Sequence, residues 1–178
     1  MAIRSYFITK DPYSGWKIGG FSVFDSEGKD LLYHIKSSYY YFERRIELSD
    51  LSSEQIIATL TYSFSIFRVK QAELSILNLS SNEWINGTVE NSFPAFHYEY
   101  IIKWNVQSIL MKTNFLSTLT TFRYENHRKI LATLKKRVFS SFWQNKYDLQ
   151  IFSDDLTDTF YFLLLTITDQ NYELDSED

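Results

Sequence analysis

Apolar and polar residues follow one another along this chain in short alternating runs, and polar turns separate the runs. Alternation with a period of two is the pattern of a strand that buries one face. About twelve such runs lie between residues 5 and 152, spaced roughly ten residues apart, which is typical of all-β sandwiches and barrels. The clearest runs are residues 21–25, 31–36, 42–48, 56–64, 97–104, 108–113, 117–124, 130–136 and 146–152.

Two further segments leave their local structure open. FRVKQAELSIL, residues 67–77, is compatible with a strand or with a helix. EWINGTV, residues 83–89, contains the pair Asn-Gly, which usually indicates a turn or a bulge. Turns are clearer at SEGK, residues 26–29, and at NHRK, residues 126–129, and the first of these predicts a β-hairpin between the runs around it.

The last apolar segment has no alternation. Residues 160–167 are apolar except for Thr166, and acidic residues flank them on both sides. The β-branched and aromatic content suits a strand, whereas the length of the run favours a buried helix. The carboxylates and hydroxyl of DDLTD, residues 154–158, suit a helix N-terminus, with Asp154 and Asp155 as capping residues. We therefore predict a helix over about residues 155–172.

A helix that is apolar all round has to be buried all round. A barrel closed around it meets this demand, because closure removes sheet edges and the helix fills the interior. In such a core the hydroxyls of Thr166 and Thr168 would return to the helix backbone. A membrane-inserted hairpin or tail anchor is the rival, but the run is shorter than the roughly 20 residues of a membrane span. The sequence predicts one domain, residues 1–178: a mainly β, closed antiparallel barrel of about twelve strands around a buried C-terminal helix.

Composition narrows the classes of function. The chain has 178 residues, is 44% hydrophobic and contains no cysteine, which excludes disulfides, thiol catalysis and cysteine metal sites. Its net charge of −4 does not suit a nucleic-acid binder. The N-terminus has no apolar run of signal-peptide length. We expect a cytoplasmic monomer with no transmembrane span, which could also lie at a membrane surface.

Charge is unevenly distributed along the chain. Residues 123–146 contain seven Lys or Arg against a single acid, and the chain from residue 147 onward contains nine acids and no Lys or Arg. The simplest interpretation of such runs is a solvated face and acidic helix ends. The sharper interpretation is a patch that faces an anion.

The basic segment LKKRVFSSFWQNK, residues 134–146, is the best functional candidate. Its cations would draw the segment to an anionic bilayer, and Phe139, Phe142 and Trp143 would bury at the headgroup level. The alternative is that these aromatics belong to the core and the cations are solvated. The predicted lipid- or anion-binding residues are Lys135, Lys136, Arg137, Arg128, Lys129 and Lys146.

No other pattern indicates chemistry. His34, His97 and His127 have no metal-ligand spacing, and we assign the first two to barrel walls and the third to a turn. Asp25 and Asp50 precede turns, where Asp bonds its own backbone. Nucleotide-binding glycine motifs and a nucleophile elbow are absent from the sequence, so we expect no catalytic residues, no metal and no cofactor, and a protein that is not an enzyme.

Three blocks carry a resemblance to a known family. FSVFDSEGKDLLYHIK resembles the I-D-x-x-G-x-x-x-Y-x-V opening of the LURP-one-related proteins, which share a fold with phospholipid scramblases and the tubby C-terminal domain. FERRIELSDLSSEQIIATLTY resembles their next block, and KYDLQIFSDDLTDTFYFLLLTITDQNYE resembles their end. The resemblance covers roughly residues 5–174. It implies a twelve-stranded barrel around a C-terminal hydrophobic helix.

The chain departs from that pattern in places. Ser52 and Ser53 stand in the turn where the family has a glycine. A calcium-type D-x-D-x-D-G loop, a cysteine cluster and a proline-rich leader are missing. Tubby-type domains bind phosphoinositide headgroups through cations on strands, but none of those positions can be carried over. LURP-one-related proteins largely lack a defined biochemical activity.

Three hypotheses about function follow. The first is a non-enzymatic module that binds anionic phospholipid or phosphoinositide headgroups at a membrane surface. The second is a protein-interaction or structural domain without lipid affinity. The third is a small-ligand binder that uses the barrel interior, which requires that the helix does not fill it.

Overall fold

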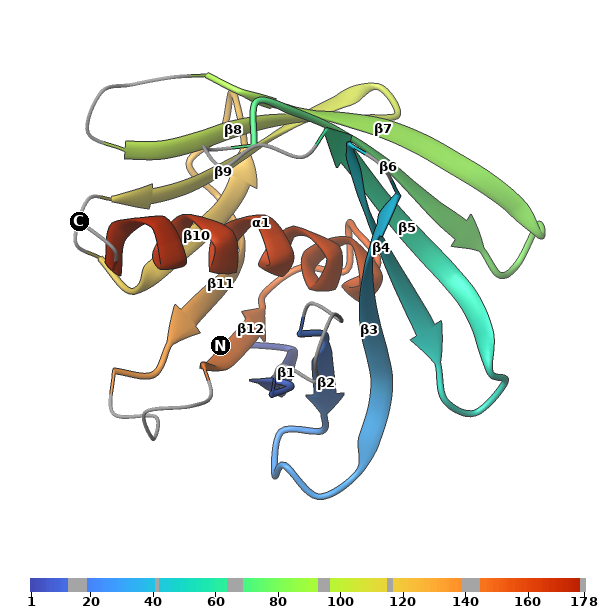
Figure 1. The fold of residues 1–178 in the computed structure, drawn as a ribbon. Coiled ribbons are helices and arrows are strands. Elements are labelled where there is room, and N and C mark those ends of the chain that lie inside the picture. The colour runs from blue at the N-terminus through green and yellow to red at the C-terminus, as the bar shows by residue number, and fades with distance from the viewer. Residues whose placement is uncertain are drawn as a thin grey trace.

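The fold was analysed in a computed structural model, which describes residues 1–12, 19–40, 42–63, 69–92, 97–114, 117–138 and 145–176. Twelve strands precede one helix in these residues (Figure 1). The strands are β1 (Arg4–Lys10), β2 (Phe21–Phe24), β3 (Leu31–Tyr40), β4 (Glu43–Asp50), β5 (Gln55–Ser63), β6 (Gln71–Asn78), β7 (Glu83–Asn91), β8 (His97–Trp104), β9 (Gln107–Asn114), β10 (Leu119–Tyr124), β11 (Ile130–Lys136) and β12 (Lys146–Ile151). The helix is α1 (Asp158–Ser176).

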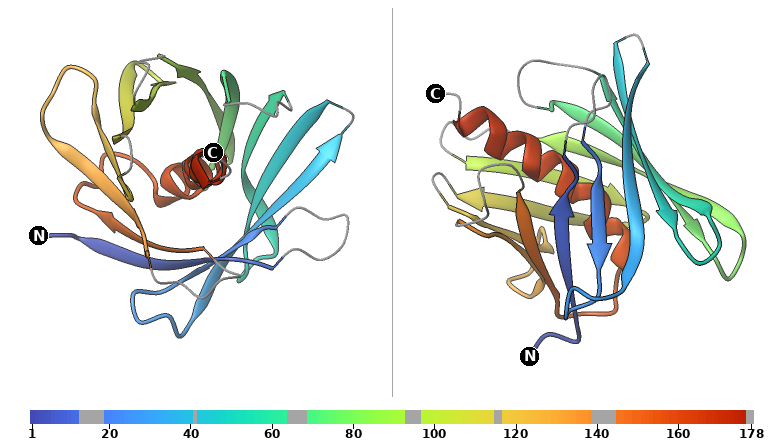
Figure 2. Two further views of the ribbon diagram at one scale, coloured as in Figure 1. Left: turned by 60° about the vertical axis from the view of Figure 1, so that its left-hand side comes forward. Right: turned by 60° about the horizontal axis from the view of Figure 1, so that its bottom comes forward.

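The strands form a closed barrel in which each strand pairs antiparallel with its neighbours in the sequence. β1 completes the ring, because it pairs with β2 on one side and with β12 on the other. Closure leaves the sheet without a free first or last strand. The left view of Figure 2 looks nearly along α1 and shows the helix inside the ring of strands. The predicted mainly β barrel around a C-terminal helix is confirmed.

The helix is the core of the barrel. Every residue from Phe160 to Thr168 is at most 1% exposed. The Thr166 hydroxyl donates to the Leu163 carbonyl at 2.7 Å, and the Thr168 hydroxyl donates to the Leu164 carbonyl at 3.2 Å. Both bonds follow the prediction for threonines buried in a helix. They let two hydroxyls lie in an apolar interior without losing hydrogen bonds.

Aromatic side chains of the strands fix the position of the helix. The Phe162 ring lies 5.0 Å from the Tyr6 ring and 5.2 Å from the Tyr33 ring, measured between centroids. The Tyr161 ring lies 5.3 Å from that of Phe122. Aromatic contacts of this kind contribute about 0.5–1.5 kcal/mol each beyond the area that they bury. The helix therefore has a defined rotation within the barrel.

The structure decides the two segments that the sequence left open. The second half of FRVKQAELSIL forms β6, a strand. Asn86 and Gly87 lie within β7, whose pairing with β6 continues without a shift through them, so the expected turn or bulge is wrong. Gly87 is required for another reason: a Cβ there would lie 2.7 Å from a ring carbon of Trp104 on β8. Close approach of a neighbouring strand, rather than a turn, explains this glycine.

The helix begins later than predicted, at Asp158 instead of about residue 155. Asp154 and Asp155 lie in the preceding turn, so their assignment as capping residues is wrong. Their carboxylates instead bind cations of the barrel, Arg4 and Lys129. Asp158 is the acid of the first helical turn, where a carboxylate faces the positive end of the helix dipole.

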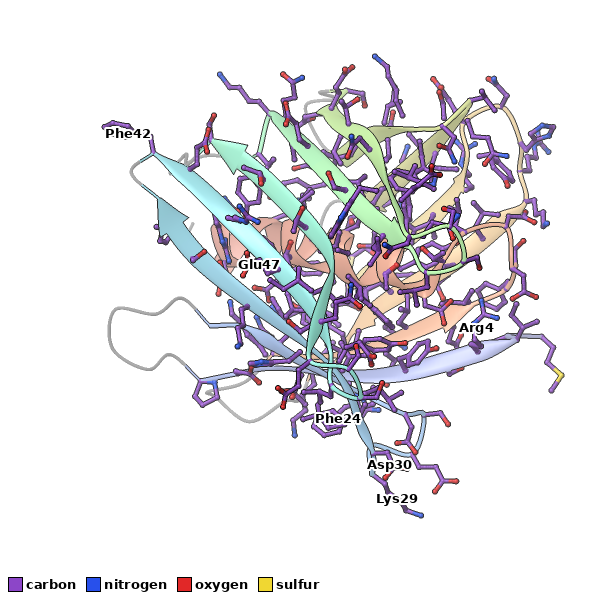
Figure 3. The ribbon with its side chains drawn as sticks, turned by 90° about the vertical axis from the view of Figure 1, so that its right-hand side faces the viewer. Arg4, Phe24, Lys29, Asp30, Phe42 and Glu47 are labelled. Atoms are coloured by element: carbon purple, nitrogen blue, oxygen red, sulfur yellow. The ribbon has the colours of Figure 1, made fainter. Side chains whose placement is uncertain are left out.

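Aspartates close two of the hairpin turns as predicted. The Asp25 carboxylate accepts hydrogen bonds from the backbone amides of Lys29, at 2.8 Å, and Asp30. Figure 3 shows Lys29 and Asp30 at the tip of that turn, pointing into solvent. The Asp50 carboxylate accepts bonds from the Ser52 and Ser53 hydroxyls at 2.6 and 2.8 Å, which lower its pKa.

In the described part of the chain, no helix is long and apolar enough to cross a membrane.

Candidate anion-binding surface

The three consecutive cations at the end of β11 do not share one face. Successive side chains of a strand point to opposite sides of the sheet. Leu134 is buried and faces the interior, so Lys135 points outward and Lys136 points inward. The register agrees, because Lys135 pairs with the half-buried Asp148 and Lys136 pairs with the buried Tyr147. The linear charge run is thus divided between the two sides of the barrel wall.

Arg137 lies on the outer side with Lys135. Its Nε donates to Asp148 Oδ2 at 2.8 Å and its Nη2 to Asp148 Oδ1 at 2.5 Å, a bidentate pair that raises the pKa of Arg137. The guanidinium carbon lies 4.5 Å from the centre of the Phe7 ring, a cation–π contact. Arg137 is therefore held in one orientation, with its charge largely compensated.

Lys146 also lies on the outer side, since it alternates with the inward Tyr147 at the start of β12. It pairs in register with Thr9 of β1. Lys135 and Lys146 form no ion pair with any residue of the described ranges. We call Lys135, Arg137 and Lys146 the outer cationic face.

Lys136 belongs to a different environment. Its ammonium lies 5.0 Å from the centre of the Tyr172 ring on α1. Burial lowers its pKa, and nearby Lys10 acts in the same direction against the opposing effects of Asp169 and Glu173. Lys136 faces the helix, so the structure separates it from the outer cationic face.

The other two predicted cations lie at the opposite end of β11. β11 has seven residues and spans roughly 20 Å. Arg128 is exposed in the turn before it, and Lys129 donates to the Ser153 hydroxyl at 3.2 Å and to the Asp155 carboxylate at 3.1 Å. The structure therefore does not bring Arg128 and Lys129 together with Lys135. Phe139, Phe142 and Trp143, the expected membrane-contacting aromatics, lie outside the described residues.

One feature that the sequence interpretation missed is a polar contact between β1 and α1 at both ends of the strand. Arg4, Tyr6, Ile8 and Lys10 alternate along β1 and face the helix. The Lys10 ammonium lies 2.6 Å from Asp169 Oδ2 and also binds Glu173. Burial opposes the charge of Lys10, but the two carboxylates outweigh it and raise its pKa. The alternation of RSYFITK was the available signal, once a central helix had been predicted.

Asp169 has further partners. The Tyr147 hydroxyl donates to it, and the Asn145 side-chain amide donates to the same oxygen at 2.9 Å. Burial, with the adjacent Asp169 charge, raises the pKa of Tyr147 well above its usual value. This buried carboxylate is saturated with donors, as a buried charge needs to be. The arrangement stabilises the fold rather than presenting a ligand site.

Two of the histidines lie in local contacts. His34 on β3 lies with Nε2 2.9 Å from Asp11 Oδ2, and the Ser22 hydroxyl donates to the other oxygen of that carboxylate. His127 is exposed in the β10–β11 turn beside the Tyr124 ring, and His97 is the first residue of β8. Among the residues that the structure describes, no three His, Cys, Asp or Glu side chains are grouped as metal ligands.

A closed antiparallel barrel of twelve strands with a hydrophobic C-terminal helix in its interior defines the tubby-like class of β-barrel domain. Within that class, the family model described as LURP-one-related matches residues 4–169. The chain belongs to the LURP-one-related family, as its sequence blocks predicted, and the relationship to tubby-like and scramblase-like domains is consistent with that family. A comparison with curated proteins and a comparison with solved structures each gave no match.

Proposed function

We propose that this LURP-one-related barrel is a non-enzymatic module that binds anionic phospholipid through the outer cationic face. The observation that carries the proposal is the placement of Lys135, Arg137 and Lys146 on one side of β11 and β12. Asp148 lies on the same side of the wall, and its carboxylate already binds Arg137. Two lysines of this face thus keep their charge available for a surface of phosphates.

The expected affinity is low. Each Lys or Arg near an anionic leaflet contributes about 1 kcal/mol, and this contribution falls off within a Debye length. A face with two available lysines and a partly compensated arginine supports weak, reversible and salt-sensitive binding. Such binding fits a protein that visits a membrane surface rather than one anchored in it.

Sedimentation with phosphatidylcholine vesicles, with and without phosphatidylserine, tests the proposal. We expect binding only to the anionic vesicles and a decrease as salt rises. Lys135→Glu with Lys146→Glu should abolish it. Lys36→Glu with Lys70→Glu is the matched control, because it changes the same charge at exposed residues on β3 and directly before β6, away from β11 and β12. Equal binding by the two double variants would reject the outer cationic face as the site.

A protein-interaction role is the second candidate. Phe42, at the tip of the β3–β4 hairpin, is 82% exposed and projects away from the barrel (Figure 3). Leu79 and Trp84, on the β6–β7 hairpin, are also exposed. Absence of vesicle binding at low salt, together with a specific partner whose binding is lost in Phe42→Ser or Trp84→Ser, would favour this role over lipid binding.

The interior offers less support for a small-ligand site. The hypothesis of an interior site required that the helix leave the barrel unfilled. The apolar face of the strands instead packs against the buried residues of α1, from Phe160 to Ile167. A ligand site is therefore expected on the outer surface of the barrel.

A further inference from the structure

A polar groove of about 430 Å³ crosses the outer wall beside Lys135. Its polar lining comes from β1, β11, β12 and the β2–β3 turn: Ser5, Ser26, Thr133, Lys135, Asp148 and Gln150. Its volume lies within the range of small-molecule sites, about 300–1,000 Å³, although such sites are usually more apolar. A polar groove of this size suits a polar ligand.

The register of the strands places these side chains next to one another on the outer surface of the barrel. Gln150 on β12 pairs with Ser5 on β1 and with Thr133 on β11, so the three lie side by side across three strands. Lys135 and Asp148 form the next outward pair in the same two strands, β11 and β12. Residues spaced by two along neighbouring strands present one continuous surface.

The β2–β3 turn forms the remaining side of the groove. Gly28, at φ 71°, lies so close to Phe7 on the outer side of β1 that a Cβ would approach its ring to 3.1 Å. The positive φ and the close contact both require glycine here. This contact holds the turn against the outer wall, and Ser26 of the same turn lines the groove.

Most polar side chains of the groove have no partner among the described residues. The side chains of Ser5, Ser26, Thr133, Lys135 and Gln150 form no hydrogen bond or ion pair there. The exception is Asp148, which binds Arg137. The groove thus offers three hydroxyls, one carboxamide and one ammonium to a ligand.

We infer that this groove binds a polyol phosphodiester, that is, one singly charged phosphate that carries a hydroxyl-rich group such as inositol or glycerol. The inference rests on the proposed phospholipid function and names its headgroup. Lys135 supplies one uncompensated positive charge for the phosphate, while Gln150, Thr133 and the serines suit ligand hydroxyls. A polyphosphorylated headgroup would need further free cations, and the Asp148 carboxylate at the groove would repel its added charge.

A vesicle panel at equal mole fraction tests the headgroup. We expect phosphatidylinositol and phosphatidylglycerol to bind several-fold more tightly than phosphatidylserine, although all three carry one net negative charge. Phosphatidylinositol bisphosphate, matched to the same total surface charge, should bind no better than phosphatidylinositol. Equal binding of phosphatidylserine and phosphatidylinositol, or tighter binding of the bisphosphate at matched charge, overturns the inference while leaving the lipid-binding function standing.

A paired variant separates hydroxyl recognition from charge. Thr133→Val with Gln150→Leu removes hydrogen-bonding groups and keeps every charge, so it should erase the preference for phosphatidylinositol over phosphatidylserine. Thr59→Val with Gln71→Leu, on the outer side of β5 and β6, is the matched control. If the groove variant still prefers phosphatidylinositol to phosphatidylserine, the groove is not the site that distinguishes the two lipids, and the inference is rejected.

Soluble glycerophosphoinositol distinguishes a headgroup site from a membrane site. Titration followed by the NMR resonances of the Gln150 and Thr133 side chains should show saturable shifts that Lys135→Gln abolishes. Shifts of this kind without any vesicle binding would reject the lipid function but keep the groove as a site for the soluble phosphodiester. No shift at these side chains, with vesicle binding intact, would reject the groove alone.

Discussion

β1 holds the central helix at two places, and the two contacts differ mainly in burial. At the N-terminal end of α1, Arg4 lies with Nε 2.8 Å from Asp158 Oδ2, where the two side chains are 35% and 16% exposed. Toward the C-terminal end, Lys10 lies with Nζ 2.6 Å from Asp169 Oδ2, where the side chains are 7% and 3% exposed. Both are ion pairs between the same strand and the same helix, so burial is the variable that distinguishes them.

The helix dipole gives the second difference. Asp158 lies in the first turn of α1, where a negative charge is favourable without any partner. Asp169 and Glu173 lie in the C-terminal half, and the last turn contains no basic residue. Glu173 lies in the last turn, where a carboxylate opposes the dipole, and Asp169 is buried one turn before it, so both charges need cations from the barrel. Lys10 and Lys136 supply this compensation from β1 and β11.

The comparison implies that the less buried pair, Arg4 with Asp158, contributes little to stability, whereas the buried pair, Lys10 with Asp169, contributes strongly. Exposed pairs contribute about 0–1 kcal/mol. Breaking a buried pair by removing one partner costs about 3–5 kcal/mol, because the remaining charge stays uncompensated in a poorly polarisable interior.

Deletion of residues 156–178 removes α1, and with it Asp158, Asp169, Glu173 and the centre of the core. We expect no cooperatively folded protein, because the inner faces of the strands would be exposed to water. Thermal unfolding followed by circular dichroism and calorimetry measures this. A truncated chain that unfolds in one sharp transition would show that the barrel is stable without its helix.

Lys10→Met breaks the buried contact alone. It removes the cation that binds Asp169 and Glu173, and we expect a loss of about 3–5 kcal/mol in the free energy of unfolding, measured by urea titration. Adding Asp169→Asn should recover part of the loss, since the amide oxygen can still accept from Tyr147 while no buried charge remains. If the double variant is as unstable as the sum of the single variants, the two residues are not coupled.

High pH should weaken the fold at the buried end. The pKa values of Lys10 and Tyr147 are raised in the folded protein, so both keep their protons at a pH where the unfolded chain loses them. Their stabilising contribution is complete below about pH 10, the usual range of these groups, and declines as the pH rises above it. Urea titrations across that range, with phenolate absorbance recorded in parallel, should show lower stability and buried tyrosines that ionise only on unfolding. Constant stability above that pH would contradict the raised pKa values.

Arg4→Met tests the less buried contact and should have the smallest effect. Asp158 keeps its favourable place in the first helical turn and its bond from the Tyr6 hydroxyl. We expect a loss of about 1 kcal/mol or less, reduced further by salt. The urea midpoint at low and high salt measures it. A loss as large as that of Lys10→Met would show that burial does not distinguish the two contacts.

Local sequence patterns were sufficient for most of the architecture. The alternating runs predicted the strands because each strand has a buried face of its own, and the all-apolar run of residues 160–167 predicted the helix because only an interior position suits it. Ser52 and Ser53 stand in a turn where the LURP-one-related pattern has a glycine. In the structure their hydroxyls bind Asp50, and Glu54 takes the positive φ of 55° in that turn. A glycine is thus dispensable there because side-chain bonds hold the turn.

The candidate site shows where local patterns are insufficient. Lys135, Lys136 and Arg137 are consecutive in the sequence, yet alternation along β11 turns one of them toward the helix. Arg128 and Lys129 are close to them in the sequence but lie a strand length away. Ser5 and Gln150 are far apart in the sequence and adjacent in the sheet.

The sequence by itself determined the class of fold, an approximate number of strands and the burial of the last segment, because each depends on the periodicity of neighbouring residues. Only the tertiary structure decided which charges meet. Barrel closure joins the first strand to the last, and through-space distance, not position along the chain, governs the interaction of two charges. The pairs of Arg4 with Asp158 and of Lys10 with Asp169, like the groove beside Lys135, exist because that closure brings β1 against β12 and around α1.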